Sequence, residues 1–418
     1  MKELYEYHLF FIQSTIMSIE HIIGNECSGC GMCISACPKN AIKYEMNRSG
    51  FFSAILDRTL CVDCGICEKI CPRIQKDNGV KLLSGRTFAA RINDVNDLLK
   101  CSSGGVATVA YKYALNNGMY IVGVYYDDEQ RQAIGKLTNL HEDIEAFRGS
   151  KYVQSDMRAA LEESITLANA NPSICFFVIA MPCQIAGFDA LLKRKGLRDR
   201  FVLADMYCHG VPSYKVWYDY CDNIKTKYGV NPKNVNFRSK KTGWGTFVVE
   251  YNIGNKRKYS FGGRDKFVTT FFDDVLLNRS CFDCSYRQEY SGADFRIGDF
   301  WGKRFRDDRN GISAVTIFTE VGQAFFDNLK IEVLGEYPTE ECVSAQSTKP
   351  YTLYEYHDVA FRELEKDNIS ISAIVKKYRK NFSKKKRKNI FIKQVMSYLP
   401  NQGRDIQSKI TKIIKRGK

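Results

Sequence analysis

Short apolar runs alternate with amphipathic segments through the central part of the chain. Strands are predicted where a short apolar run is bounded by polar residues or glycine, at 88–92, 120–126, 175–181, 201–206 and 314–318. Helices are predicted where apolar residues recur at helical spacing, at 104–117, 184–195, 213–228 and 322–329, and a β-hairpin at 246–261. This alternation predicts a mixed α/β body with at least one parallel sheet.

Ahead of this body, the pattern Cys-x-x-Cys-x-x-Cys-x-x-x-Cys-Pro occurs twice between Cys27 and Pro72. The spacing is typical of bacterial two-cluster ferredoxins, in which the fourth cysteine of each run ligates the cluster of the other run. We therefore assign one 4Fe-4S cluster to a first set, Cys27, Cys30, Cys33 and Cys71. The other cluster is assigned to a second set, Cys61, Cys64, Cys67 and Cys37. A zinc ribbon usually has two separated Cys-x-x-Cys pairs, and a disulfide scaffold requires a secreted context, so both alternatives are disfavoured.

Length and cysteine usage limit the class of protein. A chain of 418 residues is long enough for two or three domains. Its sixteen cysteines, without an export signal, indicate a reducing compartment and predict a cytoplasmic location. No apolar run is long enough to span a bilayer, and Met17 is an alternative start.

The net charge of +15 is concentrated at one end of the chain. From Lys376 onward there are sixteen Lys and Arg against a single acid, Asp405, and the remaining residues hold 46 basic and 46 acidic groups. The segment 370–418 is predicted to be a basic amphipathic tail that contacts the inner face of a membrane; a solvated tail or one bound to an acidic partner remains open. Nucleic acid is not expected as a partner, because the body has no basic stripe.

Four further cysteines are scattered through the body. Cys183 and Cys208 each follow a predicted strand directly, and Cys281 and Cys284 form a Cys-x-x-Cys pair. Ligands gather at the carboxyl ends of strands in open α/β sheets, so the first two could face one site. The alternatives are that they are small buried hydrophobic residues and that the pair binds zinc or is redox-active.

Several motifs together resemble a known family. They are Ser102-Ser103-Gly104-Gly105, Gly149-Ser150-Lys151-Tyr152, Met181-Pro182-Cys183-Gln184, Cys208-His209-Gly210-Val211-Pro212, Cys281-x-x-Cys284 and Gly298-Asp299-Phe300-Trp301-Gly302. Motifs of these kinds occur in this order in the family of coenzyme F-420 hydrogenase/dehydrogenase beta subunits, which the chain therefore resembles. The resemblance covers about residues 27–340, including the fused dicluster ferredoxin that some members carry.

The resemblance implies a flavin enzyme with FAD. It also implies a third 4Fe-4S cluster, held by a third set of cysteines, Cys183, Cys208, Cys281 and Cys284. The flavin contacts that it implies are Ser102, Ser103, Gly104, Gly105, Gly149, Ser150, Lys151 and Tyr152. Independently, Ser-Ser-Gly-Gly before a helix offers backbone N–H groups to a phosphate, although glycine before a helix is often only a turn. Lys151 could stand by a phosphate or be a surface lysine, and Asp299 and Trp301 are weaker candidates.

Other cysteines and His209 carry weaker signals. Cys101 could be a redox-active thiol near the flavin or a passive cysteine. Cys175, Cys221 and Cys342 are expected to be packing residues, because none has partner spacing. His209 could relay a proton beside Cys208 or be structural.

The predicted fold class is α+β and α/β, with a small dicluster ferredoxin-like domain, a mixed α/β flavin and iron-sulfur body and a basic helical tail. The expected domains are 17–75, 86–180 around the flavin, 181–345 with the third cluster, and 370–418, with a linker at 76–85. The expected function is an oxidoreductase that passes electrons between a ferredoxin or partner subunit and an organic small molecule, through three 4Fe-4S clusters and FAD. A non-catalytic electron-transfer subunit and an iron-sulfur interaction protein remain alternatives.

Overall fold

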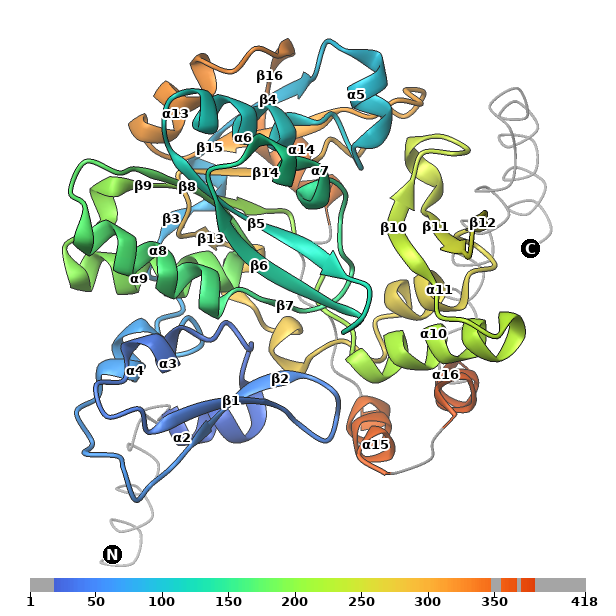
Figure 1. Ribbon diagram of the computed structural model, residues 1–418, viewed down its shortest axis with the longest axis horizontal. Coiled ribbons are helices and arrows are strands. Elements are labelled where there is room, and N and C mark those ends of the chain that lie inside the picture. The colour runs from blue at the N-terminus through green and yellow to red at the C-terminus, as the bar shows by residue number, and fades with distance from the viewer. Residues whose placement is uncertain (1–18, 347–354, 367–369, 380–418) are drawn as a thin grey trace, which may run out of the picture.

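The computed structural model describes residues 19–346, 355–366 and 370–379. Figure 1 shows a small N-terminal domain below a large twisted sheet, and a second, smaller sheet at one side. Met17 and the part of the predicted basic tail after Arg379 lie outside the described residues. The domain boundaries proposed from the sequence stay predictions.

The large sheet forms the centre of the molecule. In spatial order its strands are β16 (Glu332–Tyr337), β4 (Arg86–Arg91), β15 (Ser313–Ile317), β14 (Phe295–Asp299), β9 (Phe201–Met206), β8 (Phe176–Ile179), β5 (Tyr120–Asp127), β6 (Gln132–Thr138) and β7 (Ser155–Asp156). The four central strands β14, β9, β8 and β5 run parallel to one another, which confirms the predicted parallel sheet. All four residues of β8 are buried, as expected for a strand covered on both faces.

Helices cover both faces of this sheet (Figure 1). One face packs against α5 (Val95–Lys100), α6 (Val106–Asn116), α7 (Ile144–Phe147) and α13 (Glu320–Asp327). The other face packs against α8 (Arg158–Ala170) and α9 (Pro182–Lys195). Helix α9 begins directly after β8 and ends at Gly196, whose φ of 67° lies in the left-handed region that glycine adopts without strain.

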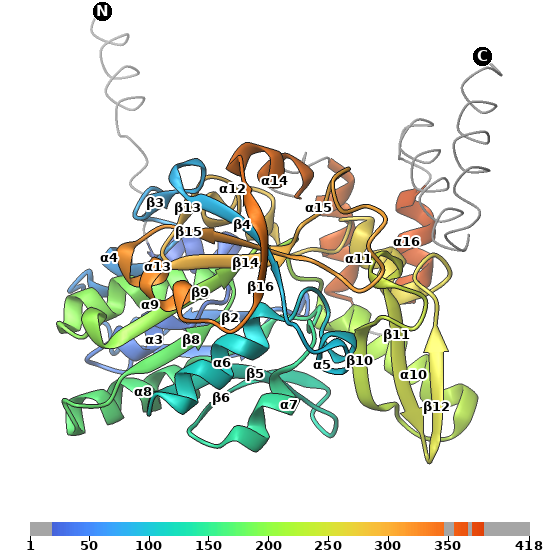
Figure 2. The ribbon, with the colours of Figure 1, turned by 90° about the horizontal axis from the view of Figure 1, so that it is seen from above.

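The smaller sheet has its own core. It contains β10 (Lys233–Ser239), β11 (Val248–Ile253) and β12 (Lys256–Ser260), and packs with α10 (Tyr214–Tyr228), α11 (Lys266–Phe272), α15 (Glu355–Leu364) and α16 (Ile371–Arg379). Trp217 is fully buried at its centre, with ring centroids 4.7 Å from Phe237 and 4.8 Å from Phe267. Figure 2 shows this unit at one end of the molecule.

The N-terminal domain lies against the helices on one face of the large sheet. It consists of α2 (Ile19–His21), the π-helical turn η1 (Ile22–Glu26), α3 (Met32–Ala36), β1 (Ile42–Met46), β2 (Phe52–Leu56) and α4 (Ile66–Ile70). Both α3 and α4 contact α9. The predicted linker contains the short strand β3 (Val80–Lys81), which pairs with β13 (Tyr290–Ser291) and fastens the domain to the body.

The remaining elements are short. They are α12 (Ser285–Gln288), α14 (Thr339–Ala345) and the 3-10 turns η2 (Leu82–Ser84), η3 (His141–Asp143), η4 (Arg198–Arg200), η5 (Trp244–Thr246) and η6 (Arg279–Cys281).

Every strand and helix predicted from periodicity is present, and its ends lie within two residues of the predicted ones. The elements that the patterns missed include β6, β7, β10, β14, β16, α8, α11 and α15. In β14 the cause is Arg296, which is buried and paired with Asp205 of β9, so a charge interrupts the apolar run. The packing role expected for Cys175 is wrong, because this cysteine is exposed at the start of β8; Cys221 and Cys342 are buried as expected.

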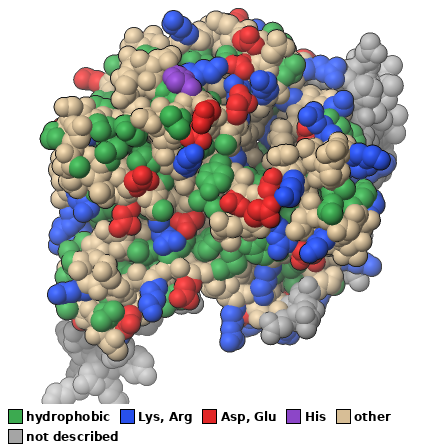
Figure 3. Space-filling view, viewed as in Figure 1, with side chains coloured by type: hydrophobic (Ala, Val, Ile, Leu, Met, Phe, Trp, Pro, Cys, Tyr) green, Lys and Arg blue, Asp and Glu red, His purple; other side chains and the backbone are tan. Residues whose placement is uncertain are grey.

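The described surface carries mixed charge. Figure 3 shows Lys and Arg interspersed with Asp and Glu over the face in view. None of the described helices is both long and apolar enough to cross a membrane.

Candidate metal centres and cofactor site

The two cysteine runs fold in the same way. Each run passes through a turn with left-handed backbone, at Gly31 and Gly65, then a five-residue helix, α3 or α4, and ends in extended conformation at Cys37 or Cys71. Such a turn lets successive sulfurs point toward one centre without a long ordered segment. The two helices contact each other, which brings the fourth cysteine of each run toward the other run.

The cysteines of the two runs lie close together. Burial raises the pKa of the Cys33 thiol, and the neighbouring thiols of Cys30, Cys27 and Cys71 in the first set, and of Cys67 in the second set, raise it further. All members of the second set, Cys37, Cys61, Cys64 and Cys67, line one cavity of about 250 Å³. Cys64 is exposed, whereas Cys30, Cys33 and Cys71 are buried, so the second set is the one that opens to the surface.

The third set is assembled from distant parts of the chain. Cys183 lies in the first turn of α9, Cys208 follows β9, Cys281 ends η6 and Cys284 precedes α12. Burial raises the pKa of the Cys183 thiol, and the other three thiols lie close enough to raise it further, so the four form one group. Because β8 and β9 are parallel neighbours, Cys183 and Cys208 leave the sheet at the same edge.

An all-cysteine set can hold either a 4Fe-4S cluster or a single zinc ion. A zinc ion would hold all its sulfurs about 2.3 Å from one metal, whereas a cubane distributes its thiolates over four irons. Within the described ranges, no three His, Cys, Asp or Glu side chains are gathered closely enough for a single ion. In the first and second sets the spacing of the runs is that of two-cluster ferredoxins, which points to 4Fe-4S clusters.

Burial keeps the free thiols protonated. It raises the pKa of Cys30 and Cys281 to about 12 and that of Cys71 and Cys208 to about 11. Iron binds the thiolate form, so cluster assembly must release these protons, and binding to iron supplies the stabilisation that burial removes.

The first and third sets adjoin each other. The thiol of Cys30 also lies close enough to raise the pKa of Cys183. A Cβ atom on Gly187 of α9 would lie 2.9 Å from Met32 Cγ and 3.5 Å from Cys30 Sγ. The first cysteine run therefore packs directly on the helix that begins at the third set.

The two segments implied to bind flavin meet each other. The backbone N–H of Ser150 donates to Ser102 Oγ at 2.8 Å, and this bond joins Ser102–Gly105 to Gly149–Tyr152. The glycine at 104 is required by packing, since a Cβ there would lie 2.4 Å from both Ala90 O and Ser313 N. The Gly-Gly pair by itself is therefore no evidence for a bound phosphate.

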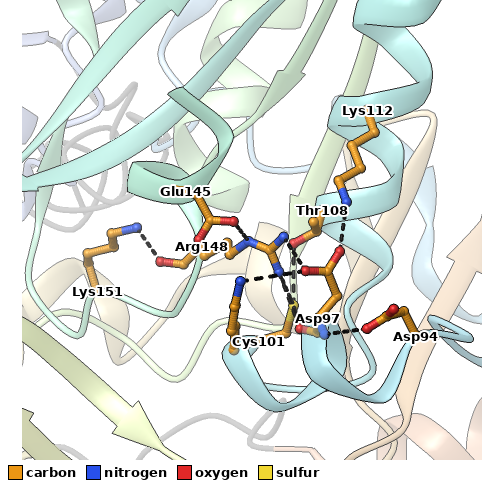
Figure 4. Close-up of polar contacts among 9 residues, drawn as sticks. Asp94, Asp97, Cys101, Thr108, Lys112, Glu145, Arg148 and Lys151 are labelled. Atoms are coloured by element: carbon orange, nitrogen blue, oxygen red, sulfur yellow. Dashed lines mark hydrogen bonds and ion pairs between the residues drawn. The ribbon is translucent and has the colours of Figure 1, made fainter. Parts of the chain in front are cut away.

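Lys151 completes the end of helix α7. Its Nζ donates to the carbonyls of Ala146, Phe147 and Arg148 at 2.9–3.0 Å, and Figure 4 shows the amine directed at the carbonyl of Arg148. Burial lowers the pKa of Lys151 to about 7, whereas the three carbonyls favour its ammonium form. The contacts give this lysine a structural role, and its contact with flavin stays a prediction.

Cys101 belongs to a polar network under the same segment (Figure 4). Its Sγ lies 3.2 Å from Asp97 O, 3.4 Å from Thr108 Oγ1 and 3.5 Å from Arg148 Nη1. The Asp97 carboxylate accepts from Arg148 at 3.0 Å and from Lys112 at 2.7 Å. This network fixes the start of the Ser102–Gly105 segment.

A cluster of aromatic and charged residues lies beside Tyr152. Arg238 is buried and donates to Asp299 Oδ2 at 2.5 Å, while Trp244 Nε1 donates to Asp299 Oδ1 at 2.5 Å. The rings of Trp244 and Trp301 stack with centroids 4.7 Å apart, and the guanidinium of Arg238 lies 5.0 Å from the centroid of Trp301. Arg238 Nε has no hydrogen-bond partner among the described residues.

Sequence reasoning missed part of this cluster. Asp299 and Trp301 were candidates, but Arg238, Lys240 and Trp244 were not. Lys240 Nζ donates to Ser103 O at 2.7 Å, which ties this segment to the Ser-Ser-Gly-Gly motif. The available signal was a basic stretch with tryptophan between two glycines, just before the predicted hairpin.

His209 links the third cysteine set to the aromatic cluster. Its Nε2 lies 2.8 Å from Asp274 Oδ1, and its ring lies 4.7 Å from Phe271. Phe271 in turn stacks on Tyr152 with centroids 5.1 Å apart. Packed side chains therefore run from Cys208 to the proposed flavin segment.

Comparison with known proteins agrees with this arrangement. Residues 26–73 match the family model of the 4Fe-4S dicluster domain, and residues 175–340 match that of the C terminus of the coenzyme F420 hydrogenase/dehydrogenase beta subunit. The chain is therefore an iron-sulfur protein of the oxidoreductase type. The chain is thus similar to coenzyme F420 hydrogenase/dehydrogenase beta subunits over residues 175–340 and carries a dicluster domain at its N-terminal end, which confirms the resemblance in the motifs.

Curated relatives come from Methanosarcina mazei and Methanocaldococcus jannaschii. The F subunit of the F(420)H(2) dehydrogenase of Methanosarcina mazei is 26% identical over 323 residues, covering 73% of this chain and 83% of the relative. The coenzyme F420-dependent sulfite reductase of Methanocaldococcus jannaschii is 23% identical over 316 residues, covering 71% of this chain and 45% of the relative. A solved chain of the F420-reducing [NiFe] hydrogenase complex from Methanosarcina barkeri has 21% identity and a TM-score of 0.43, covering 72% of this chain and 93% of that one.

The close packing at residue 104 gives a test of what the Gly-Gly pair does. We expect Gly104→Ala to destabilise the protein by about 1–3 kcal/mol, because its methyl group would collide with the backbone of β4 and of Ser313. Gly245→Ala is the control, since a Cβ there meets nothing within 4 Å, and it should change stability by less than about 0.5 kcal/mol. Thermal unfolding of the cofactor-free proteins measures both, and equal midpoints for the two variants would contradict the packing argument.

Proposed function

We propose that the chain passes electrons between a ferredoxin or partner subunit and an organic small molecule, through three 4Fe-4S clusters and FAD. The observation that carries this proposal is the continuity of the cysteine sets. The second set opens to the surface. Cys67 of that set lies close enough to Cys33 of the first set to raise the pKa of its thiol. Cys30 of the first set in turn adjoins Cys183 of the third set. Electrons could therefore cross the molecule in short steps, in either direction.

The residues beside Tyr152 fit a flavin. FAD, when bound, exchanges electrons singly with a cluster and passes them in pairs to an organic molecule. Arg238 would offer its uncommitted Nε–H and a positive charge, which stabilise electron density on a ring edge. Trp301 and Tyr152 are aromatic, but Trp244 and Phe271 already stack on them, so a flavin ring would have to meet their remaining faces or edges. Asp299 holds Arg238 in place through their ion pair.

The same surroundings would exclude water from the reacting atoms. Phe247 lies with its ring centroid 5.9 Å from Trp301 and 4.8 Å from Phe272. Phe271 stacks on Tyr152, and none of these three phenylalanines carries a titratable group. In a dry site the attraction between Arg238 and a bound anionic ring is stronger than in water.

A second candidate function is that of a non-catalytic electron-transfer subunit. The name of the Methanosarcina mazei relative, which describes one subunit of a dehydrogenase, favours it. Its distinguishing result would be a stable complex with a partner chain, and no turnover of an organic substrate by this chain alone.

Cofactor analysis of the anaerobically purified chain tests the main proposal. About twelve irons and one flavin are expected in the parent, falling to about eight irons in a Cys183→Ala/Cys281→Ala variant, because each cubane holds four irons. Cys175→Ala is the matched control and should keep all twelve, since Cys175 is an exposed cysteine outside the three sets. About eight irons in both parent and double variant, without flavin, would refute the proposal.

The surface around the second set gives a test of where a protein donor docks. Val62 is 56% exposed and lines the cavity of that set, and nearby Arg58 is already paired with Glu20 and Asp63. A charge at residue 62 would have to be desolvated when a redox protein approaches. We therefore expect Val62→Glu to slow reduction by a reduced two-cluster ferredoxin about tenfold, equivalent to about 1.4 kcal/mol.

Two controls separate docking from cluster damage. Ile55→Glu adds the same charge at another exposed apolar residue, 42% exposed, and should leave the rate with ferredoxin unchanged. Dithionite needs no docking surface and should reduce both variants as fast as the parent. Equal rates with ferredoxin in the parent and both variants would show that electrons do not enter at the second set.

A further inference from the structure

One buried side chain joins three ligand-bearing loops. Arg73 follows Cys71 and Pro72, and is 4% exposed. Its Nη2 lies 2.7 Å from a carboxylate oxygen of Glu26, the residue before Cys27. Its Nη1 donates to the carbonyl oxygen of Asp283, which lies between Cys281 and Cys284. Arg73 therefore spans the gap between the first and third cysteine sets.

Asn278 makes a second bridge across the same gap. Its Nδ2 donates to the carbonyl oxygen of Cys27 at 3.2 Å, and its backbone N–H donates to Val211 O at 2.9 Å. Its Oδ1 accepts from the N–H of Ser280 at 2.9 Å and begins the turn that leads to Cys281. Asn278 is neutral, so of these two bridges only Arg73 adds charge.

The charge of Arg73 is only partly offset. The Glu26 side chain is 34% exposed and that of Asp283 is 68% exposed, with its carboxylate 4.0 Å from Arg73 Nη2. Water screens the two carboxylates more than it screens the buried guanidinium, so the cysteines beside Arg73 experience a net positive potential.

We propose that Arg73 is a positioning residue that fixes the gap between the first and third clusters and raises the reduction potentials of both. The inference rests on the proposed function, since it requires a third cluster. Reduction adds one negative charge to a cluster, and a fixed nearby cation favours that state. The guanidinium is suited to this place because it is permanently charged and its planar fork can bind two loops at once.

The experiment is an anaerobic redox titration of the holoprotein, followed by electron paramagnetic resonance. In Arg73→Gln we expect the first and third clusters to titrate at more negative potentials, with the second cluster unchanged. Arg73→Lys keeps the charge and should restore both potentials toward the parent values. Arg58→Gln is the matched control, because Arg58 is an exposed arginine paired with two acids beside the second set, and it should leave the first and third clusters unchanged.

If Arg73→Gln fails to assemble clusters, a variant that removes a negative charge instead of a positive one provides the test. Asp283→Asn removes a screened negative charge from the same gap, so the third cluster should titrate at a less negative potential. Unchanged reduction potentials in Arg73→Gln would overturn the inference and leave the proposed function intact. If Arg73→Gln does not assemble its clusters, unchanged reduction potentials in Asp283→Asn would overturn it in the same way. A parent with about eight irons would instead refute the proposed function itself.

Discussion

The packing of the first cysteine run on α9 is the contact on which the rest of the structure depends. Gly187 leaves room for Met32 and Cys30 on one side of this helix, where a Cβ would lie 2.9 Å from Met32 Cγ. On another side Gly292 approaches so closely that a Cβ on it would lie 2.9 Å from Ala186 Cα. Because Cys183 lies in the first turn of the same helix, these small residues determine how far the third cysteine set lies from the first.

Buried charge around the third set is balanced locally. Arg296 and Asp205 are both fully buried and form two hydrogen bonds of 2.6 Å across neighbouring parallel strands. Ser291 donates to the same carboxylate at 2.8 Å, so the desolvation cost of the pair is offset by several charge-assisted bonds. Arg296 acts on the Cys208 thiol in the direction that favours the thiolate. The Arg296–Asp205 ion pair thus places a fixed dipole, and no net charge, beside the cysteines.

Much of what is encoded locally was predictable from the sequence, although α8 and β6 were missed. The two cysteine runs were recognisable because each places its ligands within eleven residues, and the central strands and helices because their periodicity is uninterrupted. Contacts made only by folding were not predictable: Arg238 meets Asp299 across 61 residues, and neither spacing nor composition marks that pair. The role of Lys151 at the end of α7 was missed for a different reason, since its acceptors are backbone carbonyls, which any residue supplies.

The C-terminal helices extend the cysteine-bearing core beyond the region that matches the family. His357 of α15 is buried, and its ring lies 4.8 Å from Phe282, the residue between Cys281 and Asp283. On the same helix Asp358 pairs with Arg279 at 2.5 Å, and Phe361 packs on Phe51 of the dicluster domain.

The contacts of α15 thus join the loop of the third set to the dicluster domain. Arg73 and Asn278 join the same two parts by direct hydrogen bonds between the cysteine loops. A cavity of about 560 Å³, lined by Cys27, Asn278 and α15, lies between the two layers of contacts. The spacing of the first and third sets is therefore held on both sides of that cavity, and residues after 340 contribute to it as directly as the cysteine loops do.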